Sequence, residues 1–289
     1  MARAARERRR RFSQSTQTRR IAVDQQINGR RVRFATGGRS IDGDEPAAVL
    51  IHGAGCDRTV WQLQTRWMAR RGYRAAAVDL PGHGGSEGPA LTGIAEMGAW
   101  LAETVDCLGL APAHLLGHSM GSFVALEAAA QHPEVAASLT LLGVAAAMPV
   151  HGALLSAAAE GDPLAGRLIT SWGVGSRART GGHASPGMWL IGANMALLER
   201  SAAGVLAADL AACDAYDSAE TAAARVRCPV TLVLGVEDRM TPERAARPLL
   251  EAFGEGLANA VRLDRTGHFM QLENPAAVRE AISAALARS

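Results

Sequence analysis

The chain of 289 residues contains no lysine, so all thirty of its basic residues are arginine, and alanine is abundant throughout. This bias is typical of a high-GC coding sequence and indicates a bacterial source rather than a particular function. No run of eighteen apolar residues occurs, which excludes a membrane-spanning helix. The N-terminal segment also lacks the hydrophobic stretch that a signal peptide requires. We therefore expect a cytoplasmic protein with no membrane span.

Cysteine is scarce, and the four cysteines (Cys56, Cys107, Cys213 and Cys228) have no regular spacing. This pattern suits reduced thiols better than a disulfide framework. Neither a His-Glu-x-x-His motif nor a paired Cys-x-x-Cys motif is found, so no zinc site is predicted. We expect chemistry that uses neither a metal nor a cofactor.

Charge is unevenly distributed. Residues 1–20 contain eight arginines and one glutamate, a net charge of +7, and since the whole chain carries +2, the remainder carries −5. Such an arm is compatible with binding to nucleic acid or an anionic surface, and with an organellar transit peptide. We interpret it instead as a disordered extension or the product of a misplaced start codon, and we expect no nucleic-acid partner.

The most informative feature present is a Gly-x-Ser-x-Gly pentapeptide at residues 117–121, between an apolar run and a helix-forming run. A serine on such a strand-to-helix turn adopts strained backbone angles that lift its hydroxyl clear of the sheet. The flanking glycines remove the Cβ atoms that would collide there. The turn also places the amide of Met120 at the N-terminus of the helix, where it can face a developing oxyanion. The sequence therefore predicts Ser119 as a nucleophile and Met120 as an oxyanion donor.

A serine nucleophile needs a base, and the base needs a carboxylate that fixes its tautomer. Residues 230–234 predict a buried strand, and Asp238 follows on its exit loop. Residues 260–263 predict a further strand that leads to His268 on the next loop. We expect both side chains at the edge of the sheet that carries Ser119.

The chain order serine, aspartate, histidine and three further segments resemble the α/β-hydrolase superfamily, in particular its single-domain esterases and enol-lactone hydrolases. Residues 50–55 (Leu-Ile-His-Gly-Ala-Gly), followed by Trp61, are similar to the family's His-Gly-x oxyanion turn. Residues 79–86 (Asp-Leu-Pro-Gly-His-Gly-Gly-Ser) resemble its Asp-x-x-Gly-x-Gly-x-Ser loop, and residues 267–275 its C-terminal histidine segment. The similarity covers nearly the whole chain.

This resemblance implies roles for residues outside the predicted triad. The amide of Ala54 would be the second oxyanion donor. His52, His83 and His118 would have structural or pocket-wall roles. Asp79 would tie its turn together by hydrogen bonds rather than take part in catalysis.

The nucleophile and its carboxylate partner each have an alternative. Haloalkane dehalogenases and epoxide hydrolases of this superfamily use an aspartate at the elbow, so the serine here argues against those reactions. Glu237 is adjacent to Asp238, and either carboxylate could instead cap the helix that begins near Pro242. Loop geometry and the family resemblance favour Asp238.

The apolar patterning predicts an α/β fold, the α/β-hydrolase fold, with a mostly parallel, doubly wound sheet. Strands are predicted at 31–35, 47–51, 74–78, 113–116, 138–142, 230–234 and 260–263, and helices at 60–71, 94–108 and 122–130. We expect residues 1–20 to form a disordered basic arm, residues 21–145 and 225–289 the two parts of the core, and residues 146–224 a helical cap.

The predicted cap is rich in alanine, leucine and methionine at helical spacing, with glycine and proline interruptions. A cap in this position lies over the nucleophile, excludes water and shapes the substrate pocket. We expect His52, His118, Trp172, Met188 and Trp189 to line that pocket. The alternative for the tryptophans and methionine is that they form the interior of the cap.

Together these features predict a serine hydrolase that cleaves a carboxylic ester or lactone of a small to medium apolar substrate through an acyl-enzyme. A thioesterase or acyltransferase would need a basic rim, for which Arg177, Arg179 and Arg200 are candidates. A carbon–carbon bond hydrolase or a perhydrolase could use the same triad, but residues 55–57 depart from the Gly-Pro-Gly turn of carbon–carbon bond hydrolases. The alternative from another functional class is a ligand receptor with slow turnover. The sequence predicts no oligomeric state.

Overall fold

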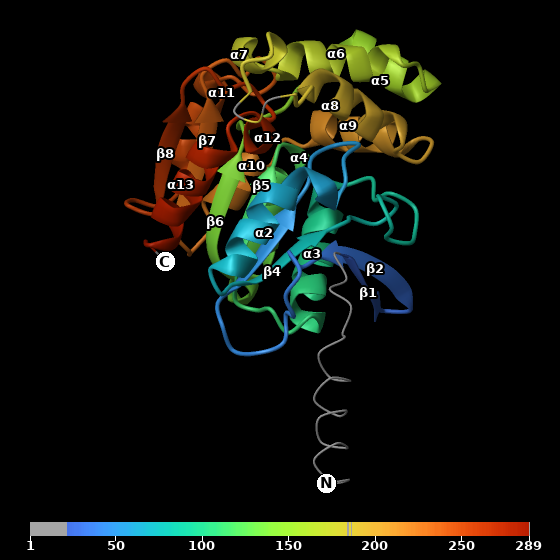
Figure 1. The fold of residues 1–289 in the computed structure, drawn as a ribbon. Coiled ribbons are helices and arrows are strands. Elements are labelled where there is room, and N and C mark those ends of the chain that lie inside the picture. Colours follow the sequence, from blue (N-terminus) through green and yellow to red (C-terminus); the bar gives the residue numbers. More distant parts are fainter. Residues whose placement is uncertain (1–21, 184, 186, 289) are drawn as a thin grey trace, which may run out of the picture.

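The computed structural model describes residues 22–183, 185 and 187–288 (Figure 1). The predicted basic arm of residues 1–20 lies outside the described residues. One eight-stranded sheet has the strand order β1-β2-β4-β3-β5-β6-β7-β8. The strands are β1 (Ala22–Ile27), β2 (Arg30–Ala35), β3 (Ala47–Ile51), β4 (Arg74–Val78), β5 (Ala113–His118), β6 (Ala136–Leu142), β7 (Val230–Gly235) and β8 (Ala258–Leu263).

The centre of the sheet is parallel, as the continuous apolar runs predict. The neighbours from β4 through β8 all pair in parallel, and every residue of β3 and β7 is buried. In contrast, β1 pairs antiparallel with β2, and β2 antiparallel with β4. The sequence analysis missed β1 because Asp24, Gln25 and Gln26 are exposed and give this edge strand no apolar pattern.

Helices cover both faces of the sheet, which places one apolar cluster on each face. The first face carries α3 (Ile94–Cys107), α4 (Met120–Gln131), α10 (Ala219–Ala223) and α11 (Glu243–Ala252). The second carries α2 (Gln62–Arg70), α12 (Met270–Glu273) and α13 (Pro275–Leu286). Two short 3-10 helices, η1 (Arg58–Trp61) and η2 (Pro133–Val135), precede α2 and β6. The helix predicted for residues 60–71 is therefore divided into η1 and α2.

A helical segment lies between β6 and β7, at the top of Figure 1. It contains α5 (Gly152–Glu160), α6 (Leu164–Gly173), α7 (Ser176–Arg179), α8 (Leu190–Glu199) and α9 (Val205–Ala215). Here α5 packs on α6 and α9, and α6 packs on α8, whereas α10 packs on α4 and α11 of the core. We call α5–α9 the upper helices; the predicted cap boundaries at 146 and 224 stay a prediction.

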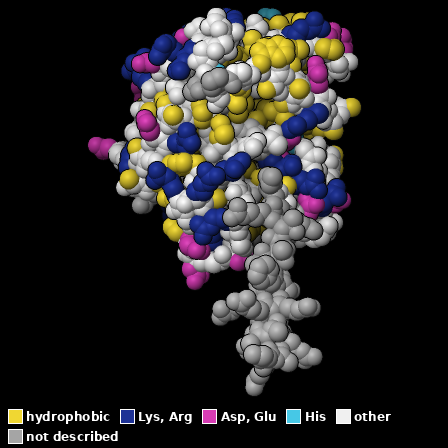
Figure 2. All heavy atoms as spheres, in the orientation of Figure 1, with side chains coloured by type: hydrophobic (Ala, Val, Ile, Leu, Met, Phe, Trp, Pro, Cys, Tyr) yellow, Lys and Arg dark blue, Asp and Glu magenta, His cyan; other side chains and the backbone are white. Residues whose placement is uncertain are grey.

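Hydrophobic side chains gather in the upper part of the face shown in Figure 2, where the upper helices lie, while arginines are spread over its middle. Three of the four large hydrophobic side chains that are exposed in the described chain (Leu164, Met188 and Trp189) belong to residues 164–189. None of the helices in the described ranges has both the length and the apolar character needed to cross a membrane.

Candidate active site

The Gly-x-Ser-x-Gly turn connects β5 to α4, and it holds Ser119 in a strained conformation with φ 54° and ψ −123°. A Cβ atom on Gly117 would lie 2.2 Å from the carbonyl oxygen of Gly121, and one on Gly121 would lie 2.4 Å from that of Ile51. Both positions therefore require glycine. The Ser119 amide donates to the carbonyl oxygen of Leu142 at 2.9 Å, which fixes the turn to the end of β6.

His268 and Asp238 come together from the loops that follow β8 and β7. Nδ1 of His268 lies 2.8 Å from Oδ2 of Asp238, and both side chains are almost completely buried. The same carboxylate accepts hydrogen bonds from the amides of Met240 and Thr241 and from the Thr241 hydroxyl. Since carboxylate oxygens only accept, Nδ1 of His268 carries the proton and Nε2 is left as the basic nitrogen.

The charge state of Asp238 follows from these contacts. Burial alone would raise the pKa of its carboxyl, but the nearby His268 and the hydrogen bonds outweigh burial, so the pKa lies below its usual value. Asp238 is therefore an anion at neutral pH. The neighbouring carboxylate, Glu237, points elsewhere and accepts from the amide and hydroxyl of Ser176 at the start of α7.

Two further side chains fix the loop that carries His268. The buried Glu273 accepts hydrogen bonds from the amides of Gly267 and Phe269, on either side of the histidine. His118 donates from Nε2 to the carbonyl oxygen of His268 at 2.9 Å. Burial and the neighbouring His268 lower the pKa of His118 to about 3, so this ring is neutral. The orientation of His268 is thus set from both the elbow and α12.

The loop after β3 lies against the elbow, because a Cβ atom on Gly53 would be 3.1 Å from that of Ser119. His52 donates from Nδ1 to the Gly53 carbonyl oxygen at 2.9 Å and accepts at Nε2 from the Leu80 amide at 3.1 Å. Burial lowers its pKa to about 3, which agrees with this neutral tautomer. Within the described part of the chain, the Ala54 amide donates to no acceptor.

Met120 supplies a second amide at the same place, because it is the first residue of α4. The first amides of a helix have no acceptor within the helix and carry the positive end of its dipole. The Met120 amide, which follows Ser119 directly in the chain, therefore has no acceptor within its helix. This arrangement can stabilise negative charge that develops next to Ser119.

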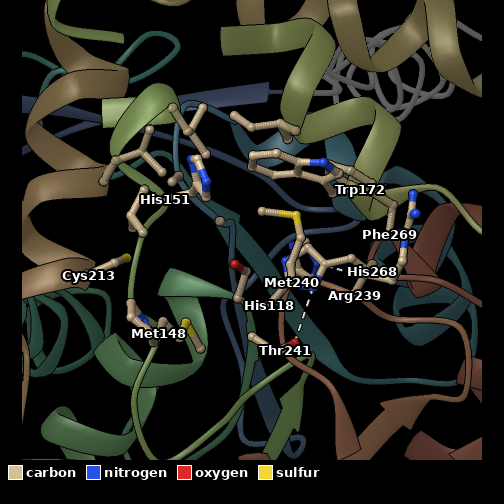
Figure 3. Close-up of a pocket in the computed structure, with 18 of the residues that line it drawn as sticks. His118, Met148, His151, Trp172, Cys213, Arg239, Met240, Thr241, His268 and Phe269 are labelled. Carbon is tan, nitrogen blue, oxygen red and sulfur yellow. Dashed lines mark hydrogen bonds between the residues drawn. The ribbon is translucent and has the colours of Figure 1, made fainter. Parts of the chain in front are cut away.

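A cavity of about 450 Å³ opens over these groups (Figure 3). Ser119, His268 and Ala54 line its floor, and apolar side chains from the loop after β6 and from α5, α6 and α9 line the rest. Figure 3 shows His151 and Trp172 on one side of the cavity and His118 and His268 on the other. The cavity is thus mainly apolar, with polar side chains at the elbow and at His151, Arg239 and Thr241.

Two of the five predicted pocket residues, His118 and Trp172, line this cavity, and three do not. His52 is wrong as a pocket residue because its ring is fully buried behind the loop after β3, where both nitrogens are used by the backbone. Met188 and Trp189 are also wrong: their side chains are 39% and 70% exposed on the outside of the upper helices. Apolar residue type alone did not reveal which way they face.

Sequence reasoning missed several lining residues. Arg239 and Phe269 directly follow Asp238 and His268, so their neighbours in the chain were a usable signal. Met148 and His151 lie on the loop after β6, at the same edge of the sheet as the elbow. A search of every loop at the carboxyl ends of the strands would have found them.

The three arginines considered as a basic rim bind the protein itself. Arg200 pairs with Asp57 at 2.6 Å, while Arg177 and Arg179 donate to backbone carbonyl oxygens of their own segment. Asp79 accepts hydrogen bonds from the Arg58 side chain and from the amides of Arg58 and Gly85, as predicted for a residue that ties its turn together. Across the described ranges, no group of three or more His, Cys, Asp or Glu side chains is arranged to hold a metal ion.

Residues 48–281 match the alpha/beta hydrolase family. Because this match covers most of the chain, the chain belongs to this family. The pimeloyl-[acyl-carrier protein] methyl ester esterase of Aromatoleum aromaticum is 31% identical over 80% of this chain and 94% of that protein. The enol-lactonase from Burkholderia xenovorans LB400 shares the fold, with a TM-score of 0.80 and 21% identity over 92% of this chain and 100% of that one.

Other similarities are partial. The dihydrolipoyllysine-residue acetyltransferase component of the acetoin cleaving system of Cupriavidus necator is 37% identical over 40% of this chain. That match covers only 30% of the relative's own length. Two further curated relatives are matched over 37% and 32% of their lengths, so the chain spans about a third of these proteins.

Proposed function

We propose that this hydrolase cleaves a carboxylic ester or lactone of a small to medium apolar substrate, with Ser119 as nucleophile, His268 as base and Asp238 as its partner. One observation carries the proposal: Ser119, in its strained turn, and His268, bonded to a buried carboxylate, line the same cavity. A hydroxyl, a histidine and a buried carboxylate in this chain order are the parts of a serine hydrolase.

The proposed reaction begins when Nε2 of His268 takes the proton of the Ser119 hydroxyl. Oγ of Ser119 attacks the substrate carbonyl, and the resulting oxyanion accepts from the amides of Ala54 and Met120. Asp238 holds the Nδ1 proton and stabilises the imidazolium. His268 then protonates the leaving alcohol, and a water molecule activated by the same histidine hydrolyses the acyl-enzyme.

The cavity supports the proposed substrate class. Its size, about 450 Å³, is in the lower part of the range for small-molecule sites, and its walls are mainly aliphatic and aromatic. The relative that this chain covers almost completely is named a methyl ester esterase, which supports an ester as the bond cleaved. Among the alternatives, a carbon–carbon bond hydrolase has weaker support, since the relative named 2-hydroxy-6-oxononadienedioate/2-hydroxy-6-oxononatrienedioate hydrolase is matched over only 45% of its length. A thioesterase or acyltransferase, a perhydrolase and a slow receptor are the remaining alternatives.

The proposal is tested by nitrophenol release from p-nitrophenyl esters of increasing acyl length, measured beside covalent labelling with a fluorophosphonate. We expect turnover with an optimum at short to medium chains, and Ser119→Ala should abolish both turnover and labelling. Ser122→Ala is the matched control, because this buried serine lies one turn away and donates to the Leu142 carbonyl oxygen.

The outcomes separate the candidates. Labelling of Ser119 without repeated turnover of any ester would move the assignment to an acyltransferase or a receptor. Hydrolysis that survives in Ser119→Ala would disprove the proposed nucleophile. Equal losses in Ser119→Ala and Ser122→Ala would mean that the loss reports damage to α4 rather than to the chemistry.

A further inference from the structure

Asp209 on α9 is a fully buried carboxylate that the proposed reaction does not use. Its Oδ2 atom accepts from the Gly55 amide at 2.7 Å and from Nε2 of His83 at 2.8 Å. Its Oδ1 atom has no hydrogen-bond partner within the described ranges. A buried carboxylate is costly unless it is paired, so its position calls for a specific role.

His83 supplies the balancing charge. Its Nδ1 atom faces the Pro81 carbonyl oxygen at 3.0 Å, and its Nε2 atom faces Asp209. Both neighbours only accept hydrogen bonds, so both ring nitrogens must carry protons and the ring is an imidazolium. Burial alone would lower the pKa of His83, but the hydrogen bond and charge of Asp209 outweigh it, and the pKa is raised above its usual value.

Among the groups that surround His83, Asp209 is its main electrostatic partner. The ring of His52 lies 4.8 Å from that of His83 and is neutral, since its pKa is lowered to about 3. The carboxylate of Asp79 also favours the charged form of His83. On the other side, burial and the charge of Asp209 raise the pKa values of the Cys56 and Cys213 thiols, which therefore remain protonated.

The contact made by Asp209 falls next to the proposed oxyanion donor. The peptide unit that contains the Ala54 N–H is held by its Gly53 carbonyl oxygen, which accepts from His52 and from the Cys56 amide. The following peptide is held by its Gly55 N–H, which donates to Asp209. Because peptide units are planar and meet at one Cα atom, fixing both units fixes the direction of the Ala54 N–H.

The upper helices also pack directly on this loop. Gly55 has φ +65°, and a Cβ atom there would lie 2.8 Å from the Leu206 side chain and 3.0 Å from that of Leu198. The first of the two peptide units is thus held by the core and the second by α9. The oxyanion loop has its full set of contacts only when α9 lies over it.

We propose that Asp209, paired with the imidazolium of His83, is a positioning residue of the oxyanion hole: it fixes the Gly55 amide and thereby aims the Ala54 N–H. This inference rests on the proposed function, because it takes Ala54 as an oxyanion donor. It makes α9 a part of the catalytic machinery as well as a wall of the pocket.

The test compares kcat and KM for Asp209→Ala, Asp209→Asn and His83→Gln on one p-nitrophenyl ester. A misaligned oxyanion donor should lower kcat less than the loss of a donor, which lowers kcat about 100- to 1,000-fold. We therefore expect Asp209→Ala to lower kcat about 10- to 100-fold with KM within about twofold. The two milder variants should lower kcat less. Inhibition by a boronic acid that mimics the tetrahedral intermediate should weaken by the same factor as kcat/KM.

Arg200→Gln is the matched control, because it removes another polar contact between the upper helices and the core, the one to Asp57, without touching the Gly55 amide. We expect its kcat to stay within about twofold of wild type. A purely structural role for Asp209 would instead give both variants the same effect, a lower melting temperature and a higher KM with kcat unchanged.

A second readout is the pH profile. Since the pKa of His83 is raised, its pairing with Asp209 is complete at low pH and is lost as the pH rises through the folded-state pKa. Wild-type kcat/KM should therefore fall at alkaline pH with a component that His83→Gln removes.

Wild-type kcat and an unchanged alkaline limb in folded Asp209→Asn and His83→Gln would overturn the inference, even if Asp209→Ala did not fold. Failure of the proposed function looks different, because hydrolysis would then survive in Ser119→Ala. Full activity in the Asp209 and His83 variants together with an inactive Ser119→Ala would reject the positioning role alone.

Discussion

The loops at the carboxyl edge of the sheet and the upper helices face each other across one cavity, but they are built differently. On the sheet side Asp238 and His268 have specific polar partners and are at most 4% exposed. In the upper helices the contacts are mainly apolar, and the buried Thr170 and Asn194 have side-chain atoms that find no hydrogen-bond partner among the described residues. The difference suggests that one region fixes the chemistry and the other selects the substrate.

Asp209 is the exception to that division, because an upper-helix carboxylate holds a loop of the sheet side. If the further inference holds, the two regions are coupled through the oxyanion hole.

The largest effect is expected at the adjacent carboxylates after β7, of which Asp238 faces His268 and Glu237 faces α7. In Asp238→Asn the amides of Met240 and Thr241, which donate to Oδ1, hold the side-chain oxygen at that position. The NH₂ group then takes the place of Oδ2, faces Nδ1 of His268 and favours the wrong tautomer of the ring. We expect kcat to fall on the order of 1,000- to 10,000-fold. Glu237→Gln should leave kcat within about threefold, and steady-state kinetics measures both.

Two results would contradict the predicted difference in kcat between Asp238→Asn and Glu237→Gln. A similar loss in both variants would show that the α7 contact is as important for turnover as the His268 contact. Near-normal kcat in Asp238→Asn would mean that His268 does not depend on this carboxylate for its tautomer.

Two glycines give the next largest effect, on stability. Gly121→Ala puts a methyl group 2.4 Å from the Ile51 carbonyl oxygen and 2.5 Å from that of His52, so the backbone must move. Overpacking of this kind costs about 3 kcal/mol. Gly152, at the start of α5, has no atom within 4 Å of the same added methyl, and Gly152→Ala should stabilise by about 0.5 kcal/mol.

Thermal and urea unfolding, followed by circular dichroism, measures both glycine changes. Because the substitution is identical, the opposite signs would come from the surroundings alone. Equal destabilisation would show that the upper helices are packed as tightly as the elbow, against the difference proposed here.

Much of the sheet side was predictable from sequence because its signals are local. The strained turn needs glycines at 117 and 121, and a short strand followed by a polar loop marks both Asp238 and His268, although only the first of these strands, β7, is fully buried. Because these signals depend only on neighbours within a few residues, they can be recognised in the sequence without knowledge of the tertiary contacts. The parallel order of the central strands followed from their continuous apolar runs.

The upper helices were harder to predict for the opposite reason. Trp172 lines the cavity while Met188 and Trp189 point to solvent, although all three have the same apolar character. Which side chains of this segment face the cavity depends on the packing between α5, α6, α8 and α9. No short sequence pattern encodes that packing. Asp209 was missed because its partners, Gly55 and His83, are more than a hundred residues away in the chain.

The smallest effect is expected at the two tryptophans of the upper helices. Trp172 lines the cavity and packs edge-on against His151, with ring centroids 5.7 Å apart, whereas Trp189 is 70% exposed. If a bound acyl chain covers roughly 50 Å² of the Trp172 face, losing that contact at about 25 cal/mol per Å² costs about 1.3 kcal/mol, or roughly tenfold in kcat/KM. Trp172→Ala should therefore lower kcat/KM for longer p-nitrophenyl esters by about 5- to 10-fold and leave the acetate ester nearly unchanged. Trp189→Ala should change neither, because its ring is outside the cavity.

A uniform loss of kcat/KM across all chain lengths in Trp172→Ala would mean that Trp172 acts in the chemical step rather than in substrate selection. An effect of Trp189→Ala on chain-length preference would mean that the upper helices close further over a bound substrate.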